Sequence, residues 1–170
     1  MIETENLKLM PYELVHFEAI LHDPARLERM LGISIADGWI EFPEAMSYGY
    51  EYLKTHTDAR GWWTYLFIHS GDRALIGTGG FKGPANDAGM VEIGYSISPQ
   101  YRNRGLATEA ARGLVRYAFS HPHIKTVDAH TLARLNPSTR VLEKIGMTKT
   151  GTMQDPEDGE LWHWRLRREN

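Results

Sequence analysis

Hydrophobic and polar residues follow two different rhythms in the middle of the chain. Residues 91–97 alternate, with apolar side chains at every second position, which predicts a strand with one buried face. From Leu106 to Phe119 the apolar residues instead recur every three or four positions, as in an amphipathic helix. Residues 124–132 again have the composition of a strand. A strand, a helix and a strand in this order predict a βαβ unit, whose two strands are parallel.

The N-terminal third of the chain shows mostly helical spacing. Residues 5–10 alternate and predict a first strand. Residues 33–44 have little pattern and are interpreted as a loop. Asp23 is the expected N-cap of one helix, which we expect to end at Gly32. Three helices are expected in this part of the chain, over residues 12–21, 24–31 and 43–54.

Strand patterns dominate the remaining segments. A helix is expected from Asn136 to Gly146, because Asn-Pro is a typical helix start and glycine a typical end. The predicted fold is α+β (mixed α/β): an antiparallel N-terminal half, one parallel pair in the middle and a closing hairpin, with helices on both faces. We expect residues 1–170 to form a single domain. The further strands are expected over residues 62–69, 73–81, 147–154 and 161–167.

Composition and charge exclude several classes of protein. The 170 residues have a formal net charge of −3, so no basic field attracts nucleic acid or an anionic membrane surface. The chain has no cysteine, which excludes thiol nucleophiles, disulfides and thiolate metal sites and suits a reducing compartment. No apolar run approaches the length of a membrane span. We therefore expect a cytoplasmic protein that acts on neither nucleic acid nor membrane.

The turn before the predicted central helix has the features of an anion site. Several backbone N–H groups of residues 103–107 have no partner inside that helix and lie at the positive end of its dipole. Gly105 leaves room for a ligand, and Arg102 and Arg104 add positive charge. The turn therefore predicts a phosphate or pyrophosphate site. A capped surface helix with a solvated basic turn is the alternative, and a binder of nucleotide or flavin phosphates would also explain this turn.

The predicted topology places two helix starts at one edge of the sheet. Ligands of such sheets favour the carboxyl ends of the parallel strands, where neighbouring connections diverge. Residues 98–105 and 133–138 both follow these strand ends. We therefore expect both segments to line one crevice.

Four sequence motifs together resemble a known family. Residues 102–107 (RNRGLA) are similar to the pyrophosphate loop of the GNAT N-acetyltransferases. The segments EIGY at residues 92–95, AHTL at residues 129–132 and NPSTRVLEKIGM at residues 136–147 follow in the order seen in that family. They resemble the RimJ/RimL-like branch, which acetylates the N-termini of ribosomal proteins. The resemblance covers nearly the whole chain.

The resemblance implies a GNAT fold and acetyl-CoA as cosubstrate. It implies a mixed, mostly antiparallel sheet of about seven strands with one splayed parallel pair. The pantetheine arm would lie between the splayed strands and bond to the backbone near Tyr95, Ser96 and Ile97. Asn136 and Ser138 would lie beside the thiol. The pyrophosphate would be held by Arg102, Asn103, Arg104, Gly105, Leu106, Ala107 and Thr108.

Acetyl transfer requires a base, a polarising donor and an acid. Glu92 is the candidate base, because desolvation on a central strand is expected to raise its pKa. Its alternative role is a charge paired with Arg or Lys, or a solvated residue. A backbone N–H near Tyr95 or Ser96 is the expected polariser. Many family members have a Tyr acid where this chain has Leu142, so Ser138 is the substitute candidate, with helix capping as its alternative role.

Other polar residues give weaker indications. Asp128 and His130 share one face of the strand at residues 124–132 and could line the cleft or be ordinary sheet residues. His163 has no assigned role. His121 and His123 flank a proline without an evident third ligand, so no metal is expected.

The resulting hypothesis is an acetyl-CoA-dependent N-acetyltransferase that acts by direct attack in a ternary complex. The acceptor is expected to be a primary amine, at a protein N-terminus or on a small molecule. Without cysteine, no thiol can form an acyl-enzyme. The alternative is a catalytically silent CoA-binding sensor or interaction module on the same fold. A homodimer is compatible with either function.

Overall fold

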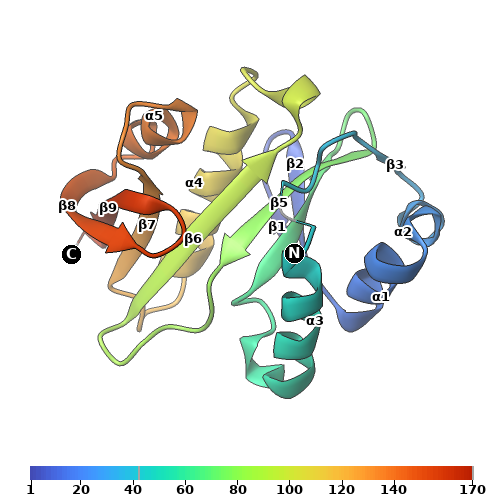
Figure 1. Cartoon of the computed structure of the whole chain (residues 1–170), viewed down its shortest axis with the longest axis horizontal. Coiled ribbons are helices and arrows are strands. Elements are labelled where there is room, and N and C mark those ends of the chain that lie inside the picture. Colours follow the sequence, from blue (N-terminus) through green and yellow to red (C-terminus); the bar gives the residue numbers. More distant parts are fainter. Residues whose placement is uncertain (42, 170) are drawn as a thin grey trace.

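The computed structural model describes residues 1–41 and 43–169 and shows a mixed sheet with helices on both faces (Figure 1). The strand order is β1-β2-β4-β5-β6-β7-β9-β8, and β3 pairs with β5. The strands are β1 (Ile2–Glu3), β2 (Leu7–Pro11), β3 (Ser34–Ile35), β4 (Thr64–His69), β5 (Ala74–Phe81), β6 (Met90–Ile97), β7 (Thr126–Leu132), β8 (Thr148–Asp155) and β9 (Gly159–Arg167). The helices are α1 (Leu14–His22), α2 (Pro24–Leu31), α3 (Ala45–Thr55), α4 (Leu106–Phe119) and α5 (Pro137–Lys144), with 3-10 turns η1 (Thr57–Ala59) and η2 (Pro99–Tyr101).

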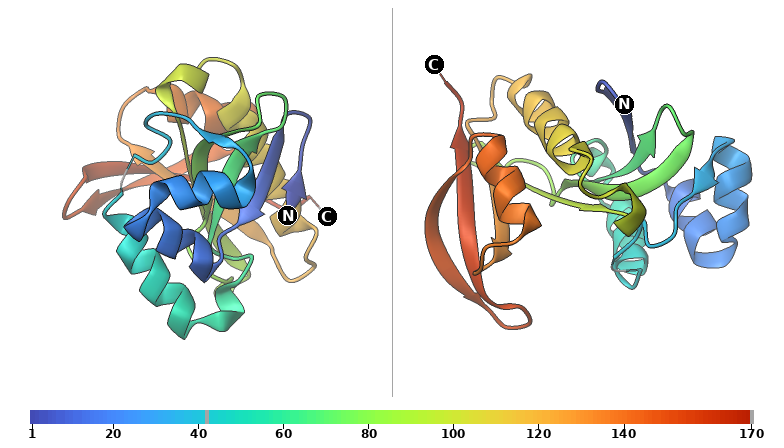
Figure 2. Two further views of the ribbon diagram at one scale, coloured as in Figure 1. Left: turned by 90° about the vertical axis from the view of Figure 1, so that its right-hand side faces the viewer. Right: turned by 90° about the horizontal axis from the view of Figure 1, so that it is seen from above.

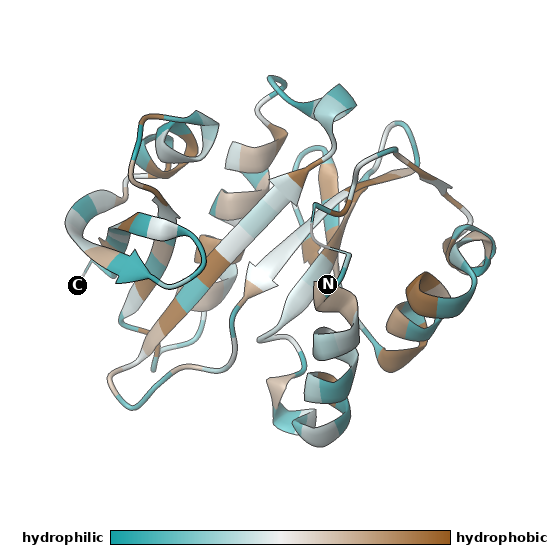
Figure 3. Cartoon of the chain, in the orientation of Figure 1, coloured by the Kyte–Doolittle hydropathy of each residue, from teal (hydrophilic) through white to brown (hydrophobic). Residues whose placement is uncertain are grey.

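The alternation along β4 shows how the sheet separates two cores. Tyr65 and Phe67 point into the core that α4 covers, whereas Leu66 and Ile68 point into the core beneath α1, α2 and α3. Apolar residues of β6 and α4 meet in the first core, and the hydropathy colouring shows the same alternation along β6 (Figure 3). The β8–β9 hairpin lies at the opposite end of the molecule from α1 and α2 (Figure 2). Burial on both faces thus fixes the register of the sheet.

The predicted βαβ unit is confirmed. Strands β6 and β7 are parallel, with α4 in the connection between them. Their pairing runs from Met90 opposite Thr126 to Glu92 opposite Asp128 and ends there. Beyond that point β6 remains paired with β5, and β7 with β9. The two strands therefore separate at their carboxyl ends, as the splayed pair in the resemblance implied.

Two short strands add to the predicted set. β1 pairs with β2, and β3 pairs in parallel with β5. Strand β3 falls inside residues 33–44, so the expectation of a loop throughout that segment was wrong at Ser34–Ile35. Two residues are too few to show a periodicity. For this reason the sequence predicted about seven strands, whereas residues 1–41 and 43–169 form nine. No helix in the described part of the chain has the length and apolar character that crossing a membrane requires.

Candidate functional site

The turn before α4 adopts an unusual backbone conformation. Asn103 and Gly105 both have positive φ angles, of 61° and 78°. When the sign of φ alternates between neighbouring residues, successive N–H groups point toward one concave surface, which is a common anion-binding geometry. Ser98 fixes the start of this segment, because its N–H donates to Ile76 and its hydroxyl donates to the carbonyl of Asp37 at 2.6 Å.

The backbone N–H groups of residues 103–108 have no hydrogen-bond partner among the described residues. The first amide of this region that is bonded belongs to Glu109, which donates to the carbonyl of Gly105 at 2.9 Å. No side chain of the described residues caps α4, and a Cβ at Gly105 would meet none of their atoms within 4 Å. The unpaired amides expected from the sequence are therefore present and open. Their binding of a pyrophosphate stays a prediction, although the donors and the space fit one.

The two arginines of the turn are exposed, and the guanidinium group of each makes a contact within the protein. Nε of Arg102 donates to the carbonyl of Ile97 at 3.1 Å. The guanidinium of Arg104 lies 4.8 Å from the centre of the Tyr101 ring. Both arginines belong to the turn that precedes α4, so their positive charge adds to that of the helix dipole.

The separated end of β6 presents backbone N–H groups to the gap between β6 and β7. Lys82 donates to the carbonyl of Glu92, and Ser98 donates to Ile76, so the peptide groups of even-numbered residues face β5. In an antiparallel ladder the intervening residues face the other way, which places the N–H groups of Tyr95 and Ile97 toward the gap. Ser96 instead directs its hydroxyl to Glu41 Oε2 at 3.1 Å, so its proposed cofactor contact receives less support.

Glu92 is the last residue of β6 that is paired with β7, and it is ion-paired. Its Oε1 contacts Lys82 Nζ and accepts a hydrogen bond from Nδ1 of His130, 3.0 Å away. Burial alone would raise the pKa of Glu92, but the hydrogen bonds from Lys82 and His130, together with the positive charge of Lys82, outweigh it and lower this pKa below its ordinary value. The expectation of a raised pKa was wrong, because both partners lie on other segments of the chain.

The start of α5 leaves one hydroxyl free. Asn136 caps the helix by accepting from the N–H of Thr139 at 3.0 Å, and Thr139 returns a bond through its own side chain. The Ser138 hydroxyl has no hydrogen-bond partner in residues 1–41 and 43–169, so it does not cap the helix. The Ser138 carbonyl accepts from the Tyr95 phenol at 3.3 Å, which joins β6 to α5 across the gap. Burial raises the pKa of this phenol.

Leu142 cannot supply an acid, and its side chain is buried in the core between α5 and the sheet. Ser138 is therefore the remaining candidate for the acid. Its hydroxyl lies at the start of α5 and has no partner among the described residues, so it is free to donate. Its role as an acid stays a prediction.

The sequence predicted only part of a cluster of polar side chains that lies next to Glu92. Asp128 accepts two hydrogen bonds from Arg165, at 2.8 and 2.6 Å, and lies 2.7 Å from Nε2 of His163. The rings of His130 and His163 stack with 4.9 Å between their centres. The shared strand face of Asp128 and His130 was readable from the sequence. Their pairing with β9 was not, because it depends on strand order.

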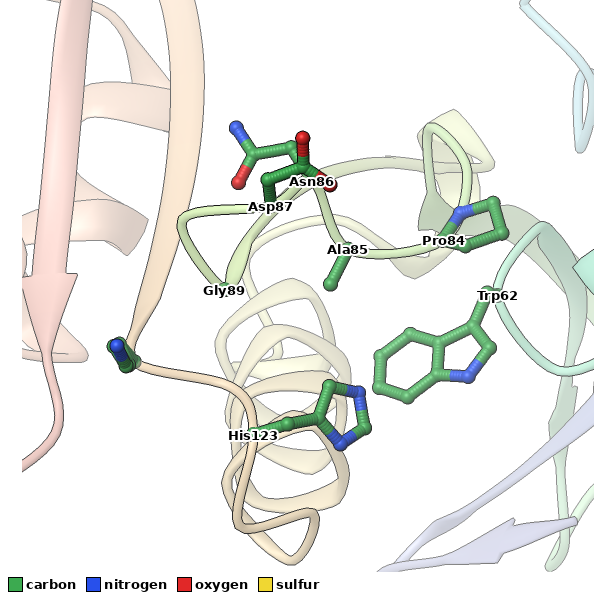
Figure 4. Close-up of a pocket in the computed structure, with 8 residues that line it drawn as sticks. Trp62, Pro84, Ala85, Asn86, Asp87, Gly89 and His123 are labelled. Atoms are coloured by element: carbon green, nitrogen blue, oxygen red, sulfur yellow. The ribbon is translucent and has the colours of Figure 1, made fainter.

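A surface pocket lies at the other end of the parallel strands. Trp62 and His123 lie side by side along it, with 6.2 Å between their ring centres, and the turn before β6 closes one side (Figure 4). It adjoins the amino ends of β6 and β7, whereas the open amides lie beyond their carboxyl ends. This pocket is therefore separate from the candidate site. No group of three or more potential ligands in the described residues could hold a metal ion.

Comparisons with known proteins agree on one family. The model of the acetyltransferase (GNAT) domain matches residues 6–148. The uncharacterized N-acetyltransferase YjdG of Bacillus subtilis (strain 168) is 25% identical over 166 residues, which cover 96% of each chain.

Solved structures share the fold. RimL, a ribosomal L7/L12 alpha-N-protein acetyltransferase in complex with coenzyme A, superimposes with a TM-score of 0.69 at 14% identity, over 96% of this chain and 95% of that one. Spermidine N-acetyltransferase from Vibrio cholerae gives a TM-score of 0.67 at 16% identity, over 95% and 94% of the two chains. With the matched domain covering most of its length, the chain belongs to the GNAT family of acetyltransferases and is an N-acetyltransferase.

Proposed function

We propose that this enzyme transfers the acetyl group of acetyl-CoA to a primary amine by direct attack in a ternary complex. The main support is the run of unpartnered amides at residues 103–108, beside a parallel pair that separates after Glu92. These two features offer an anion cradle and an adjoining gap for an extended arm. We also propose a place in the RimJ/RimL-like branch, supported by the motifs at residues 92–95 and 136–147.

The binding of acetyl-CoA would divide between three segments. The amides of residues 103–108 would hold the pyrophosphate, with Arg102 and Arg104 beside it. The N–H group of Ile97 would bond to the pantetheine arm in the gap, the N–H of Tyr95 would lie nearer the thioester, and the side-chain amide nitrogen of Asn136 would lie near the end of the arm. When bound, acetyl-CoA supplies an activated acetyl thioester.

The chain's own groups would handle the protons. A primary amine is mostly protonated at neutral pH, so a base must accept its proton before attack. The carboxylate of Glu92 lies on the open face of β6, beside Gly94, whose Cβ position is empty. The N–H of Tyr95 would polarise the carbonyl oxygen, and the free hydroxyl of Ser138 would protonate the departing thiolate.

The acceptor is proposed to be a protein N-terminus or a small-molecule amine. RimL and spermidine N-acetyltransferase show that similar folds are found in enzymes named for both kinds of acceptor. The open face of β6, α3 and the β8–β9 hairpin would shape the acceptor cleft. A cytoplasmic location is supported by the cysteine-free sequence.

Thiol release from acetyl-CoA with a panel of amines, including peptides, tests this function. We expect release with at least one class of amine, and saturable CoA binding by calorimetry. Silence with the whole panel while CoA still binds would contradict turnover and favour a CoA-binding sensor.

The role of Ser138 is tested by Ser138→Ala. Removal of an unpartnered hydroxyl costs no internal hydrogen bond, so we expect an unchanged melting temperature and CoA affinity. If Ser138 protonates the thiolate, kcat should fall about 100-fold or more, the lower end of the usual range for a general acid. Ser120→Ala, at the end of α4, is a distant control that should leave kcat unchanged. An unaltered kcat in Ser138→Ala would remove Ser138 from the mechanism.

A further inference from the structure

The polar cluster beside the separated strands contains two carboxylate–histidine pairs. Glu92 contacts His130, and Asp128 contacts His163, with 3.0 and 2.7 Å between the bonded atoms. The two rings are stacked at 19° to each other. Glu92 and Asp128 form the last paired position of β6 and β7, and His130 lies two residues beyond it on β7. The cluster therefore lies where the strands begin to separate.

The hydrogen bond to Glu92 determines which nitrogen of His130 carries a proton. The pKa of Glu92 is low, so this carboxylate is ionised near neutral pH and only accepts hydrogen bonds. Nδ1 of His130 must then carry the proton, and Nε2 of the neutral ring has a free lone pair. Nε2 has no partner among the described residues. Among the described residues, Nε1 of Trp63 is the single side-chain nitrogen or oxygen that is both buried and without a hydrogen-bond partner. Nε2 of His130 has no partner and is a different atom, so it is not buried and reaches solvent.

His163 differs from His130, since both of its nitrogens are engaged. Nε2 faces the Asp128 carboxylate, and Nδ1 lies 2.8 Å from the hydroxyl of Thr150. Asp128 is almost fully buried and is also held by Arg165, so the ring of His163 is fixed on both sides. His163 thus provides a rigid surface against which the His130 ring stacks.

The groups around His130 carry balanced charges. Lys82 and Arg165 are positive, Glu92 and Asp128 are negative, and these four charges cancel. A proton added to Nε2 gives an imidazolium that faces the Glu92 carboxylate through Nδ1–H. A carboxylate that both orients an imidazole and stabilises its charged form is the arrangement of a general base and its partner.

We propose that His130 is the general base of the acetyl transfer and that Glu92 and His163 position it. The proposal rests on the proposed function, and it assigns the role of base to His130 instead of Glu92. Nε2 of His130 takes one proton from the acceptor ammonium, which leaves a neutral amine. The amine nitrogen bonds to the acetyl carbon as the carbon–sulfur bond breaks. The Ser138 hydroxyl gives its proton to the departing thiolate and takes the second proton of the amine nitrogen in exchange, and His130 later releases its proton to solvent.

Three matched variants test the assignment through the pH dependence of kcat/KM. In the wild type we expect an acid limb between about pH 5 and 8, where histidine changes charge. His130→Gln should lose this limb and at least about 100-fold in kcat/KM, with CoA affinity within twofold. Glu92→Gln can still accept from Nδ1–H, so it should lose about 10-fold and keep an altered limb. His123→Gln, at the far end of β7, is the control.

A structural defect is distinguished from a chemical one by rescue. His130→Ala should recover part of its activity with added imidazole, and its melting temperature and CoA affinity should remain near those of the wild type. Nitrogen NMR of the histidine side chains should show His130 with its proton on Nδ1. The proposal is overturned if His130→Gln keeps the rate and the limb while Glu92→Gln abolishes them, or if NMR shows the proton on Nε2. Wild-type silence with every amine would instead overturn the proposed function itself.

Discussion

The carboxylate of Asp128 is buried, and it accepts hydrogen bonds from Arg165 and contacts His163. Burial raises the pKa of Asp128, but the partners Arg165 and His163 more than offset this and hold it below the ordinary value. The unfolded chain therefore takes up a proton at a higher pH than the folded one. This contribution to stability is present above the ordinary Asp pKa and is lost as the pH falls through the folded pKa.

Asp128→Asn should reduce the free energy of unfolding at neutral pH by about 1–3 kcal/mol, because Arg165 loses its ionic partner. The variant should also lose less stability than the wild type on acidification. Urea unfolding at pH 7 and in mild acid measures both effects. Asp87→Asn, at an exposed turn, is the control and should change stability by less than about 0.5 kcal/mol. Equal acid sensitivity of Asp128→Asn and the wild type would contradict this account.

Single residues also show where the sequence is a sufficient guide. Gly105 was assigned from its local context, and its positive φ follows from the turn in which it lies. Glu92 was identified as a site residue, but the direction of its pKa shift was not predictable. That direction depends on Lys82 and His130, which are close to Glu92 only in the folded sheet.

At the scale of elements, Glu109 joins the N-terminal hairpin to α4. Its carboxylate accepts from the hydroxyl of Thr4 at 2.6 Å, and from the backbone and side chain of Asn6 at 2.6 and 3.0 Å. Burial raises the pKa of Glu109, yet these hydrogen bonds lower it overall. The stabilisation it provides is therefore lost as the pH falls through its folded pKa.

Glu109→Ala should destabilise the protein by about 1–3 kcal/mol, since hydrogen bonds to a charged group are removed together. Faster hydrogen exchange in β1 and β2 should accompany this loss, whereas β7 and β9 should be unaffected. Glu143→Ala, on the exposed face of α5, is a matched control. Unchanged exchange in β1 and β2 would show that Glu109 does not hold the hairpin.

Long periodic elements were predictable and short ones were not. The stripe of apolar residues identified α4 almost to the residue, because fourteen residues give several turns of the pattern. Strands β1 and β3 have two residues each and owe their existence to pairing with neighbours. Their position could follow only from the assembled sheet.

At the scale of the molecule, the site depends on two halves of one sheet that separate. The core beneath α4 continues under both halves, while β6 and β7 diverge after Glu92 and Asp128. The sequence predicted the parallel pair and the two helix starts at its carboxyl end. It could not predict the stacked histidines, because His163 of β9 lies 33 residues along the chain from its partner His130 in β7.

The central claim is that the open amides after Arg102 hold the pyrophosphate of coenzyme A. Gly105→Ala tests it, because an alanine there is strained at a φ of 78° and places its Cβ in the space before the amides. Gly159→Ala is a matched control, with a φ of 77° and equally open space, in the β8–β9 turn.

Calorimetric titration of CoA into the wild type and both variants is the decisive measurement. We expect saturable binding by the wild type, an affinity at least about tenfold lower in Gly105→Ala, equivalent to about 1.4 kcal/mol, and wild-type affinity in Gly159→Ala. The absence of binding by the wild type, or equal affinities for Gly105→Ala and the wild type, would contradict the account.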